Sequence, residues 1–411
     1  LKIIESSVFG YCSSLTEIKI PDSIEKIKNN AFMNCKSLKK IKIPSNVKEI
    51  GHCSFKDCEK LNELIMDPYE TQIQNDSFLN CTSLVHFIFD ENITQVHQYD
   101  NKLIPTIKKV SLPKSAEIIK WSSFSQFSTL EEIVIPSTIT EISSNSFNEC
   151  ISLIQITIPS SVRSIGSSSF KGCSSLRQVT ILGSLEEIGD NVFDGCKSLE
   201  QLVIPDSVTI IGVGAFEQCT SLKHIILPRS LRIIKEKAFY ECSSLEKIDI
   251  PSSVISIEKD TFKNCTALAK IEIPDSVKSI GSNALCNCSS LMNVSIPFGI
   301  TEISESLFNE CSNLKEASIP NSVSSIGNNA FYKCSSLEKI EIPSSVTSIG
   351  ENAFFECSSL KQISIPSSVT SIGANAFKKC TELAQITLPS SFSPRNIGIQ
   401  SFFGKVKVNR I

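Results

Sequence analysis

The chain has 411 residues, a formal net charge of −3, 17 cysteines and one tryptophan. This near-neutral charge gives no reason to expect nucleic acid or an anionic membrane as a partner. No apolar run approaches the ~18 residues that a membrane span needs, so no membrane span is predicted in this segment.

The cysteines reveal an internal repeat. Most of them lie 23 residues apart, in a ladder of seventeen positions that runs from Cys12 to Cys380. Fifteen of these positions are cysteine, and Ile104 and Phe127 occupy the other two. A fixed period of this kind determines the fold before any local pattern does. We therefore predict a single elongated domain over residues 1–411, although length alone would suggest two or three domains.

One unit shows what each repeat is expected to form. Leu337–Cys357 begins with alternating apolar residues, which predict a short strand with one buried face. Pro343 ends that strand, because proline cannot donate to a ladder. A second short apolar pair ends at Gly350, where we expect a turn with positive φ. The spacing in Ala353–Cys357 then predicts a single helical or 3₁₀ turn that points Ala, Phe and Cys inward.

One such unit cannot bury its own apolar face, but stacked units can. Strands in successive coils of the same direction are parallel. The sequence therefore predicts a leucine-rich-repeat solenoid of about 17 stacked 23-residue repeats. It would carry a continuous parallel sheet on one face and short strands or 3₁₀ turns on the other.

The pattern L-x-x-I-x-I-P followed by S-V-x-x-I-G-x-x-A-F-x-x-C resembles the BspA-like leucine-rich repeat family. These are 23-residue repeats on surface proteins of oral and commensal bacteria and of anaerobic protists. The resemblance covers essentially the whole chain. It implies a right-handed, curved β-solenoid whose parallel sheet forms the concave face. It also implies adhesion or other protein binding, and no catalysis.

The ladder cysteines coincide with core slots. Because Ile104 and Phe127 fill the same slot, we predict buried, reduced thiols that act as small hydrophobic groups. Disulfides between successive ladder positions are the alternative. No Cys-x-x-Cys or Cys-His set has metal-ligand spacing, so neither a metal site nor a cofactor is expected.

The first repeats are regular, and residues 67–127 are irregular. One irregular turn carries Asp100-Asn101 in place of the Ala-Phe pair, and we expect it to be looser than the others. Aromatic residues gather in this region outside the core slots: Tyr69, Tyr99 and Trp121. They predict a recognition patch, because exposed Trp and Tyr are favoured interface anchors. Local repacking around the degenerate turn is the alternative.

The repeats from Cys150 to Cys380 are regular, and the outward-facing strand residues change along them. An uncharged strip comes first, formed by Gln155, Thr157, Gln178, Thr180, Gln201, Val203, His224 and Ile226. It is predicted to be the better partner-binding surface, because desolvating uncharged groups costs less; the alternative is that Gln and Thr simply suit a solvated strand. Mixed charges follow, as in Lys247/Asp249 and Lys270/Glu272, and we expect them to pair across strands.

The two ends differ from the repeat. The sequence begins in mid-repeat without Met, which suggests that Leu1 is a fragment end. Residues 390–411 contain a two-residue insertion and then alternate basic residues with valine. They are predicted to form a C-terminal capping unit with an edge strand.

No constellation for catalysis is predicted. His86 and His224 share a repeat slot but lie six repeats apart, and the acidic residues alternate with lysines. We therefore expect a non-enzyme. Six Asn-x-Ser/Thr sequons permit glycosylation in a secretory setting, but they do not argue for one.

The leading hypothesis is a monomeric surface or secreted protein that binds a host or extracellular protein through its concave sheet. The alternative is an intracellular, cytoplasmic scaffold, or the recognition arm of a larger protein. A periplasmic or structural coat protein is a third class. Buried reduced thiols fit the alternative slightly better, because oxidising compartments favour disulfides. The family resemblance favours the surface protein.

Overall fold

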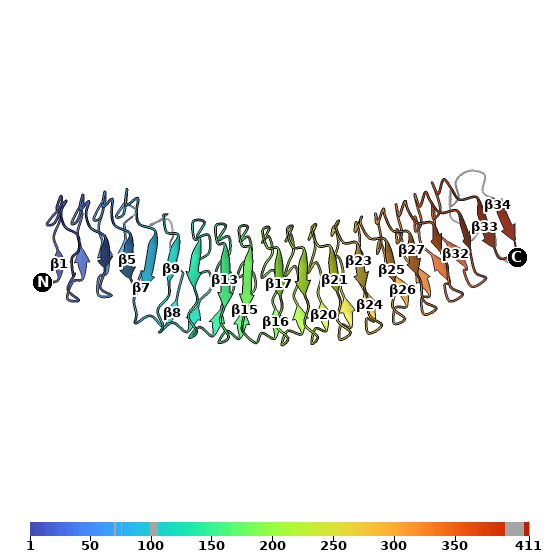
Figure 1. The fold of residues 1–411 in the computed structure, drawn as a ribbon, viewed down its shortest axis with the longest axis horizontal. Coiled ribbons are helices and arrows are strands. Elements are labelled where there is room, and N and C mark those ends of the chain that lie inside the picture. Colours follow the sequence, from blue (N-terminus) through green and yellow to red (C-terminus); the bar gives the residue numbers. More distant parts are fainter. Residues whose placement is uncertain (70, 75, 99–105, 391–406, 411) are drawn as a thin grey trace. The chain divides into compact units, whose positions relative to one another are not determined.

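The computed structural model describes residues 1–69, 71–74, 76–98, 106–390 and 407–410. Contacts divide the chain into two compact units: unit 1, Leu1–Ser184, and unit 2, Leu185–Ile411. Each unit is a stack of coils whose short strands pair in parallel with those of neighbouring coils (Figure 1). No helix occurs among the described residues. The predicted parallel β-solenoid is thus confirmed, whereas the single domain over 1–411 stays a prediction.

Unit 1 contains a longer and a shorter series of strands. The longer strands are β3 (Lys40–Lys42), β5 (Glu63–Met66), β7 (His86–Phe89), β9 (Lys109–Ser111), β11 (Glu132–Val134), β13 (Gln155–Ile158) and β15 (Gln178–Ile181). The two-residue strands are β1 (Ile3–Ile4), β2 (Lys26–Ile27), β4 (Glu49–Ile50), β6 (Gln72–Ile73), β8 (Gln95–Val96), β10 (Ile118–Ile119), β12 (Glu141–Ile142) and β14 (Ser164–Ile165).

Unit 2 repeats the arrangement. Its first series is β17 (Gln201–Val203), β19 (His224–Ile226), β21 (Lys247–Asp249), β23 (Lys270–Glu272), β25 (Asn293–Ser295), β27 (Glu316–Ser318), β29 (Lys339–Ile340), β31 (Gln362–Ser364), β33 (Gln385–Leu388) and β34 (Lys407–Arg410). Its second series is β16 (Glu187–Ile188), β18 (Ile210–Ile211), β20 (Ile233–Ile234), β22 (Ser256–Ile257), β24 (Ser279–Ile280), β26 (Glu302–Ile303), β28 (Ser325–Ile326), β30 (Ser348–Ile349) and β32 (Ser371–Ile372).

Paired strands lie in register at the repeat period. Ile156 of β13 faces Val179 of β15, and both side chains are buried while their strand neighbours point outward. The register is retained through the irregular repeats, where His86 of β7 faces Lys109 of β9. At the last pairing Gln385 faces Lys407, so β34 is the strand expected near this end. The rest of the predicted capping unit, from 391 to 406, lies outside the described residues.

The Ala-Phe-Cys segment forms a third ladder between coils. Ala31 and Met33 donate their N–H groups to carbonyls three residues earlier (3.3 and 3.1 Å). Phe32 and Asn34 instead donate to carbonyls on the next coil (2.7 and 2.8 Å). This alternation requires residues in the left-handed backbone conformation, and φ is 58° at Asn30 and 59° at Asn34. The segment is therefore a hydrogen-bonded turn, not the helical or 3₁₀ turn that its spacing predicted. The two-residue strands supply the predicted short strands.

The reason for the repeat glycine differs from the one that the sequence suggested. The prediction of positive φ at Gly350 is wrong, because the positive φ values in this coil lie at Asn352 (53°) and Glu356 (58°). A Cβ atom at Gly350 would instead lie 2.6 Å from the backbone nitrogen of Asn328. Glycine therefore fits because the preceding coil approaches too closely for a side chain.

Phenylalanine rings stack along the interior of each unit. In unit 1 the ring centroids of neighbouring coils lie 5.0–5.2 Å apart in two runs, Phe9 to Phe32, Phe55 and Phe78, and Phe124 to Phe147 and Phe170. In unit 2 they lie 5.2–5.5 Å apart in two further runs, Phe193 to Phe216, Phe239 and Phe262, and Phe308 to Phe331, Phe354 and Phe377. Such offset stacks add to the free energy gained from burial alone.

The ladder thiols lie beside these rings. Every ladder cysteine from Cys35 to Cys380 is buried, which confirms the predicted core slot, whereas Cys12 is exposed. The Sγ atom of Cys242 donates to the carbonyl of Phe216 at 3.1 Å, and equivalent bonds recur along both units. Burial raises the thiol pKa, to about 12 at Cys173, because a thiolate would lose its solvation there.

Surface charges pair in two different ways. On the longer strands of unit 1, pairs such as Lys40–Glu63 (3.2 Å) and Lys109–Glu132 (2.9 Å) join neighbouring coils. In unit 2 the expectation that Lys247/Asp249 and Lys270/Glu272 pair across strands is wrong. The register places Lys247 opposite Lys270, so each lysine instead contacts the carboxylate of its own strand, at 2.9 and 2.6 Å. An unvaried repeat places like charges side by side, which is unfavourable.

Candidate functional site

The outward side chains of the longer strands form what we call the strand face of each unit. In unit 1 the predicted strip lies on β13 and β15, where Gln155 faces Gln178 and Thr157 faces Thr180. Three of these side chains are exposed and Thr180 is half-buried. The strip continues one strand earlier at Val134 of β11, which is 61% exposed. This part of the strand face therefore offers uncharged groups to a partner.

In unit 2 the predicted strip lies on β17 and β19. Gln201 faces His224, and Val203 faces Ile226. Val203 and Ile226 are each 61% exposed, so two large apolar side chains stand next to each other on a solvated sheet. Large exposed apolar side chains that adjoin one another are more informative than scattered ones.

Sequence reasoning missed a depression farther along the strand face of unit 2. Its volume is about 670 Å³, and it lies over β23, β25 and β27. Buried Ile271, Ile273 and Val294 line it, and Met292 on its rim is 50% exposed. The small residues Ser295 and Ser318 leave it open. The sequence predicts a charged region here, because Lys270 and Glu272 dominate its pattern. Met292, in a slot that Lys or Glu usually fills, was the available signal.

The aromatic residues of the irregular region are placed only in part. Tyr69 is 62% exposed, and its ring stacks on that of His97 at 4.3 Å. Trp121 is 60% exposed. Tyr99 and the turn expected to be looser, with Asp100-Asn101, lie outside the described residues. A patch that includes all three aromatics stays a prediction.

His86 lies on the strand face of unit 1 between two polar neighbours. Its Nε2 is 2.8 Å from the Ser111 hydroxyl oxygen, and its Nδ1 is 3.8 Å from a Glu63 carboxylate oxygen. Partial burial lowers the His86 pKa, and the nearby Glu63 charge opposes that shift only in part. His86 is therefore a neutral hydrogen-bonding group near pH 7.

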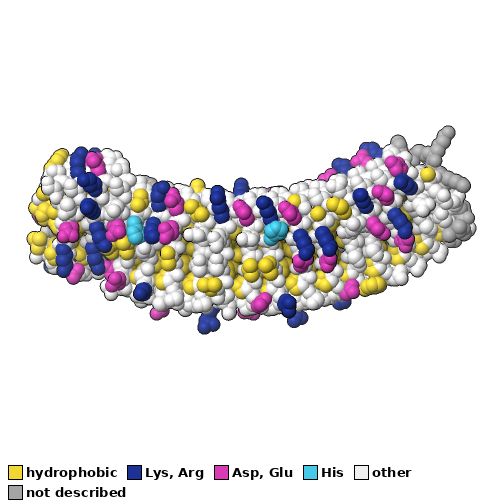
Figure 2. Space-filling view, viewed as in Figure 1, with side chains coloured by type: hydrophobic (Ala, Val, Ile, Leu, Met, Phe, Trp, Pro, Cys, Tyr) yellow, Lys and Arg dark blue, Asp and Glu magenta, His cyan; other side chains and the backbone are white. Residues whose placement is uncertain are grey.

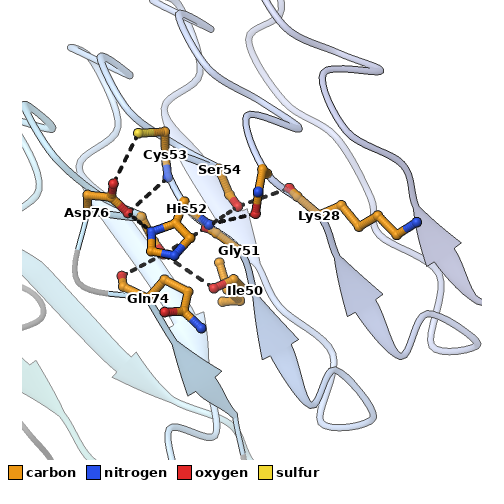
Figure 3. A network of polar contacts seen from close by, with 10 residues as sticks. Lys28, Ile50, Gly51, His52, Cys53, Ser54, Gln74 and Asp76 are labelled. Atoms are coloured by element: carbon orange, nitrogen blue, oxygen red, sulfur yellow. Dashed lines mark hydrogen bonds and ion pairs between the residues drawn. The ribbon is translucent and has the colours of Figure 1, made fainter.

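One cluster brings a thiol, an imidazole and a carboxylate together (Figure 3). The Asp76 carboxylate lies 3.0 Å from Nδ1 of His52 and accepts a bond from Sγ of Cys53 at 3.3 Å. Burial works against ionisation of Asp76, but the bonds from Cys53 and His52 outweigh it and lower the Asp76 pKa. Burial and the bond to Asp76 raise the Cys53 pKa.

This arrangement does not activate the thiol. A nucleophilic cysteine needs a base that takes its proton, and its pKa is usually depressed. Here the thiol and the imidazole both face the same carboxylate, and the thiol pKa is raised. The cluster therefore acts as a cap on the turn that begins at His52, with Asp76 also accepting the Cys53 N–H.

Neither a metal centre nor a membrane segment emerges in the part of the chain that the structure describes. Within those ranges, no three His, Cys, Asp or Glu side chains lie where they could share one metal ion. The described residues also include no helix long and apolar enough to cross a membrane. Figure 2 shows instead a face on which hydrophobic and charged side chains are interspersed. The features that remain are extended surfaces suited to contact with another molecule.

Comparisons with known proteins agree with this geometry. The family model described as a BspA-type leucine-rich repeat region matches residues 2–100, 102–223, 186–315 and 301–411. A leucine-rich repeat protein from Bacteroides ovatus is similar in structure, with a TM-score of 0.71 and 29% identity over 91% of this chain and 92% of that chain. A leucine-rich cell surface protein from Faecalibacterium prausnitzii shares 28% identity over 91% of this chain and 84% of that one, with a TM-score of 0.44. The comparison with curated proteins found no match.

Proposed function

This chain belongs to the BspA-type leucine-rich repeat family, and on that basis we propose that it is a surface or secreted protein that binds a host or extracellular protein. Leucine-rich repeats are a protein-interaction fold, and their stacked coils give extended binding surfaces. Binding, without catalysis, is the role that we assign to the strand face. The family resemblance supports the surface location.

The observation that carries the proposal is the exposure of Val203 and Ile226 side by side on β17 and β19. A partner that covers them would bury apolar area worth ~25 cal/mol per Å². The flanking Gln201 side chain can hydrogen-bond a partner without the desolvation cost of a full charge, and His224 adds a second hydrogen-bonding group. The apolar-lined depression at Met292 offers a second contact point within the same unit.

Binding is tested with the purified chain on an array of extracellular-matrix proteins and, in parallel, of cytosolic proteins. We expect saturable binding to a matrix protein, and a loss of about tenfold or more when Val203→Asp and Ile226→Asp are combined. The matched control is Ile255→Asp, because Ile255 is 40% exposed in the same unit but lies outside the longer strands. Equal binding by the double variant and the control would remove this site from the proposal.

Location is tested separately by protease treatment of intact source cells, followed by immunoblotting for this segment. Loss of the signal from intact cells is the expected result. A signal that survives until the cells are permeabilised would contradict the surface assignment.

An intracellular scaffold is the second candidate function, and the thiols favour it. All seventeen cysteines are free, and Cys53 is only half-buried. Partly exposed free thiols are more usual in reducing compartments. The buried ladder thiols are shielded from oxidants in either compartment, so they do not distinguish the two candidates.

A further inference from the structure

Unit 2 carries a groove that is lined only by turn residues and by none of the longer strands. Its volume is about 780 Å³, and it crosses five consecutive coils. Two rows of side chains line it, one member of each row per coil. The first row is Asn287, Glu310, Lys333, Glu356 and Lys379, and the second is Ser289, Ser312, Ser335, Ser358 and Thr381.

The charges in the groove neutralise one another. Lys333 contacts Glu310 at 3.1 Å, and Lys379 contacts Glu356 at 2.5 Å. The hydrogen bond from Lys333 to Glu310 also raises the Lys333 pKa, so this lysine stays charged at neutral pH. A charged ligand would have to break these pairs. An uncharged ligand can use them as fixed donors and acceptors.

The hydroxyl row repeats with the coils. The Ser335 hydroxyl donates to the Ser312 carbonyl, and the Ser358 hydroxyl donates to the Ser335 carbonyl, both at 3.2 Å. Each hydroxyl oxygen therefore keeps its lone pairs for a ligand. The rings of Phe331 and Phe354 give the coil spacing here as 5.2 Å. A polymer whose units advance by about one coil can place one unit on every coil.

Lysine stems supply apolar surface at the first row, and two aromatic rings contact these lysines from outside the groove lining. Tyr332 and Phe355 stack at 5.0 Å, and each precedes a groove residue in the chain. Lys333 lies 5.3 Å from the centroid of the Tyr332 ring, and Lys379 lies 5.1 Å from that of Phe355. These contacts hold the lysine methylenes in fixed positions. Apolar patches beside fixed polar groups suit the C–H faces and the hydroxyls of sugar rings.

We propose that this groove binds a linear, uncharged polysaccharide of β-1,4-linked pyranose units. Such a chain advances by about one coil spacing per sugar and presents hydroxyl groups at every unit. An extended peptide fits less well, because its residues advance by ~3.3 Å, which does not match the coil spacing. The proposal concerns a different surface from the strand face and does not depend on protein binding there.

The test is isothermal titration of the purified chain with hexamers of β-1,4-linked glucose and of β-1,4-linked N-acetylglucosamine. We expect binding of at least one hexamer, and affinity for the corresponding monosaccharide about tenfold or more weaker, because one sugar contacts only one coil. Combining Ser335→Tyr with Ser358→Tyr fills the groove from outward positions, and we expect it to weaken hexamer binding by about tenfold or more.

The matched control is Ser243→Tyr, which occupies the same repeat slot in unit 2 but does not line the groove. Thermal melts of all variants show whether the fold is kept. The proposal is overturned if neither hexamer binds, or if the monosaccharide binds as tightly as the hexamer. It is also overturned if a folded Ser335→Tyr/Ser358→Tyr variant binds as well as the Ser243→Tyr control.

Discussion

The phenylalanine stack is interrupted once in each unit, and the two interruptions are built differently. In unit 1 the gap lies between Phe78 and Phe124. There Phe89 packs edge-on against Phe87 (4.9 Å, 82°) and Phe124 (6.1 Å, 89°). In unit 2 Leu285 simply replaces the phenylalanine between Phe262 and Phe308, and it is buried. The first interruption recruits rings from other slots, whereas the second keeps the repeat and exchanges one apolar residue for another.

This difference shows that different apolar side chains can fill the same part of the interior. Phe89 comes from a strand slot that isoleucine usually occupies, and Phe127, which packs edge-on to Phe124 at 5.7 Å, comes from the thiol slot. Both are buried. The interior is therefore constrained by filled apolar volume more than by the identity of any one residue. The thiol slots distinguish the interruptions further, because the first has Ile104 and Phe127 in consecutive thiol slots, whereas the second retains Cys288.

Alkaline pH should give the largest loss of stability. It should destabilise the coil of the second interruption, which contains the Cys288 thiol, and not that of the first. The folded pKa of Cys288 is raised well above its usual value by burial and by the neighbouring thiols. The stability that this thiol contributes is fully present below its unfolded pKa of ~8.5 and is lost as pH rises further, by ~1.4 kcal/mol per pH unit. The eight ladder thiols of unit 2 with raised pKa values act together.

Urea unfolding between pH 8 and 10.5 measures this loss. We expect the urea concentration at the unfolding midpoint to fall steeply above pH 9. Cys288→Val should reduce the slope of this fall by about one eighth, because it removes one of the eight thiols. Amide protection at Leu130, which donates to Phe127, and at Leu291, which donates to Cys288, gives a local comparison. Equal pH dependence of the two protections would contradict this account.

Truncating Phe89 should give the next largest effect. Phe89→Ala removes the ring that fills the first interruption, and we expect it to lower the free energy of unfolding by ~3–5 kcal/mol. Phe239→Ala, in an uninterrupted stack with 5.4 Å spacing, is the reference and should cost a similar amount. Chemical denaturation of both variants measures the difference. A loss of less than ~1 kcal/mol in the free energy of unfolding of Phe89→Ala would mean that this ring does not replace the stabilisation lost at the missing phenylalanine.

Restoring the ring at the second interruption should give the smallest effect. Leu285→Phe would join the Phe262 and Phe308 stacks, and we expect a gain of ~0.5–1.5 kcal/mol from stacking, less any cost of overpacking. The reciprocal change, Phe239→Leu, should lose less than ~1.5 kcal/mol. The shift in melting temperature measures both. A strongly destabilised Leu285→Phe variant would show that the side chains packed around Leu285 leave no volume for a phenylalanine ring.

Much of the fold could be predicted from the sequence. The register of β13 with β15, the buried thiols and the retained pairing of β7 with β9 all follow from the repeat, because residues 23 apart must occupy equivalent sites. Two of the expectations that fail concern the local backbone. The sequence predicts positive φ at Gly350 and a helical or 3₁₀ turn in the Ala-Phe-Cys segment, because a single repeat does not show the close approach of the preceding coil or the bonds to the next one.

The candidate surfaces were only partly predictable. The sequence predicts Val203 and Ile226 only as outward members of an uncharged strip, and the structure exposes both. The only sequence signal for the depression is Met292 itself, in a slot that Lys or Glu usually fills, and no single residue marks the groove along Ser335 and Ser358. Each depends on how far neighbouring side chains reach, and those neighbours are one or more coils away in the chain.

The sequence by itself determined the period, the parallel order of the strands and the residues that face inward, because a repeated apolar pattern has one way to bury itself by stacking. Only the tertiary structure decided which charges pair, which glycine is crowded and where the surface is hollowed. Those outcomes depend on atoms brought together across coils. The exchange of cross-coil pairs such as Lys109–Glu132 for in-strand pairs such as Lys247–Asp249 shows that equivalent slots acquire different partners once the coils are stacked.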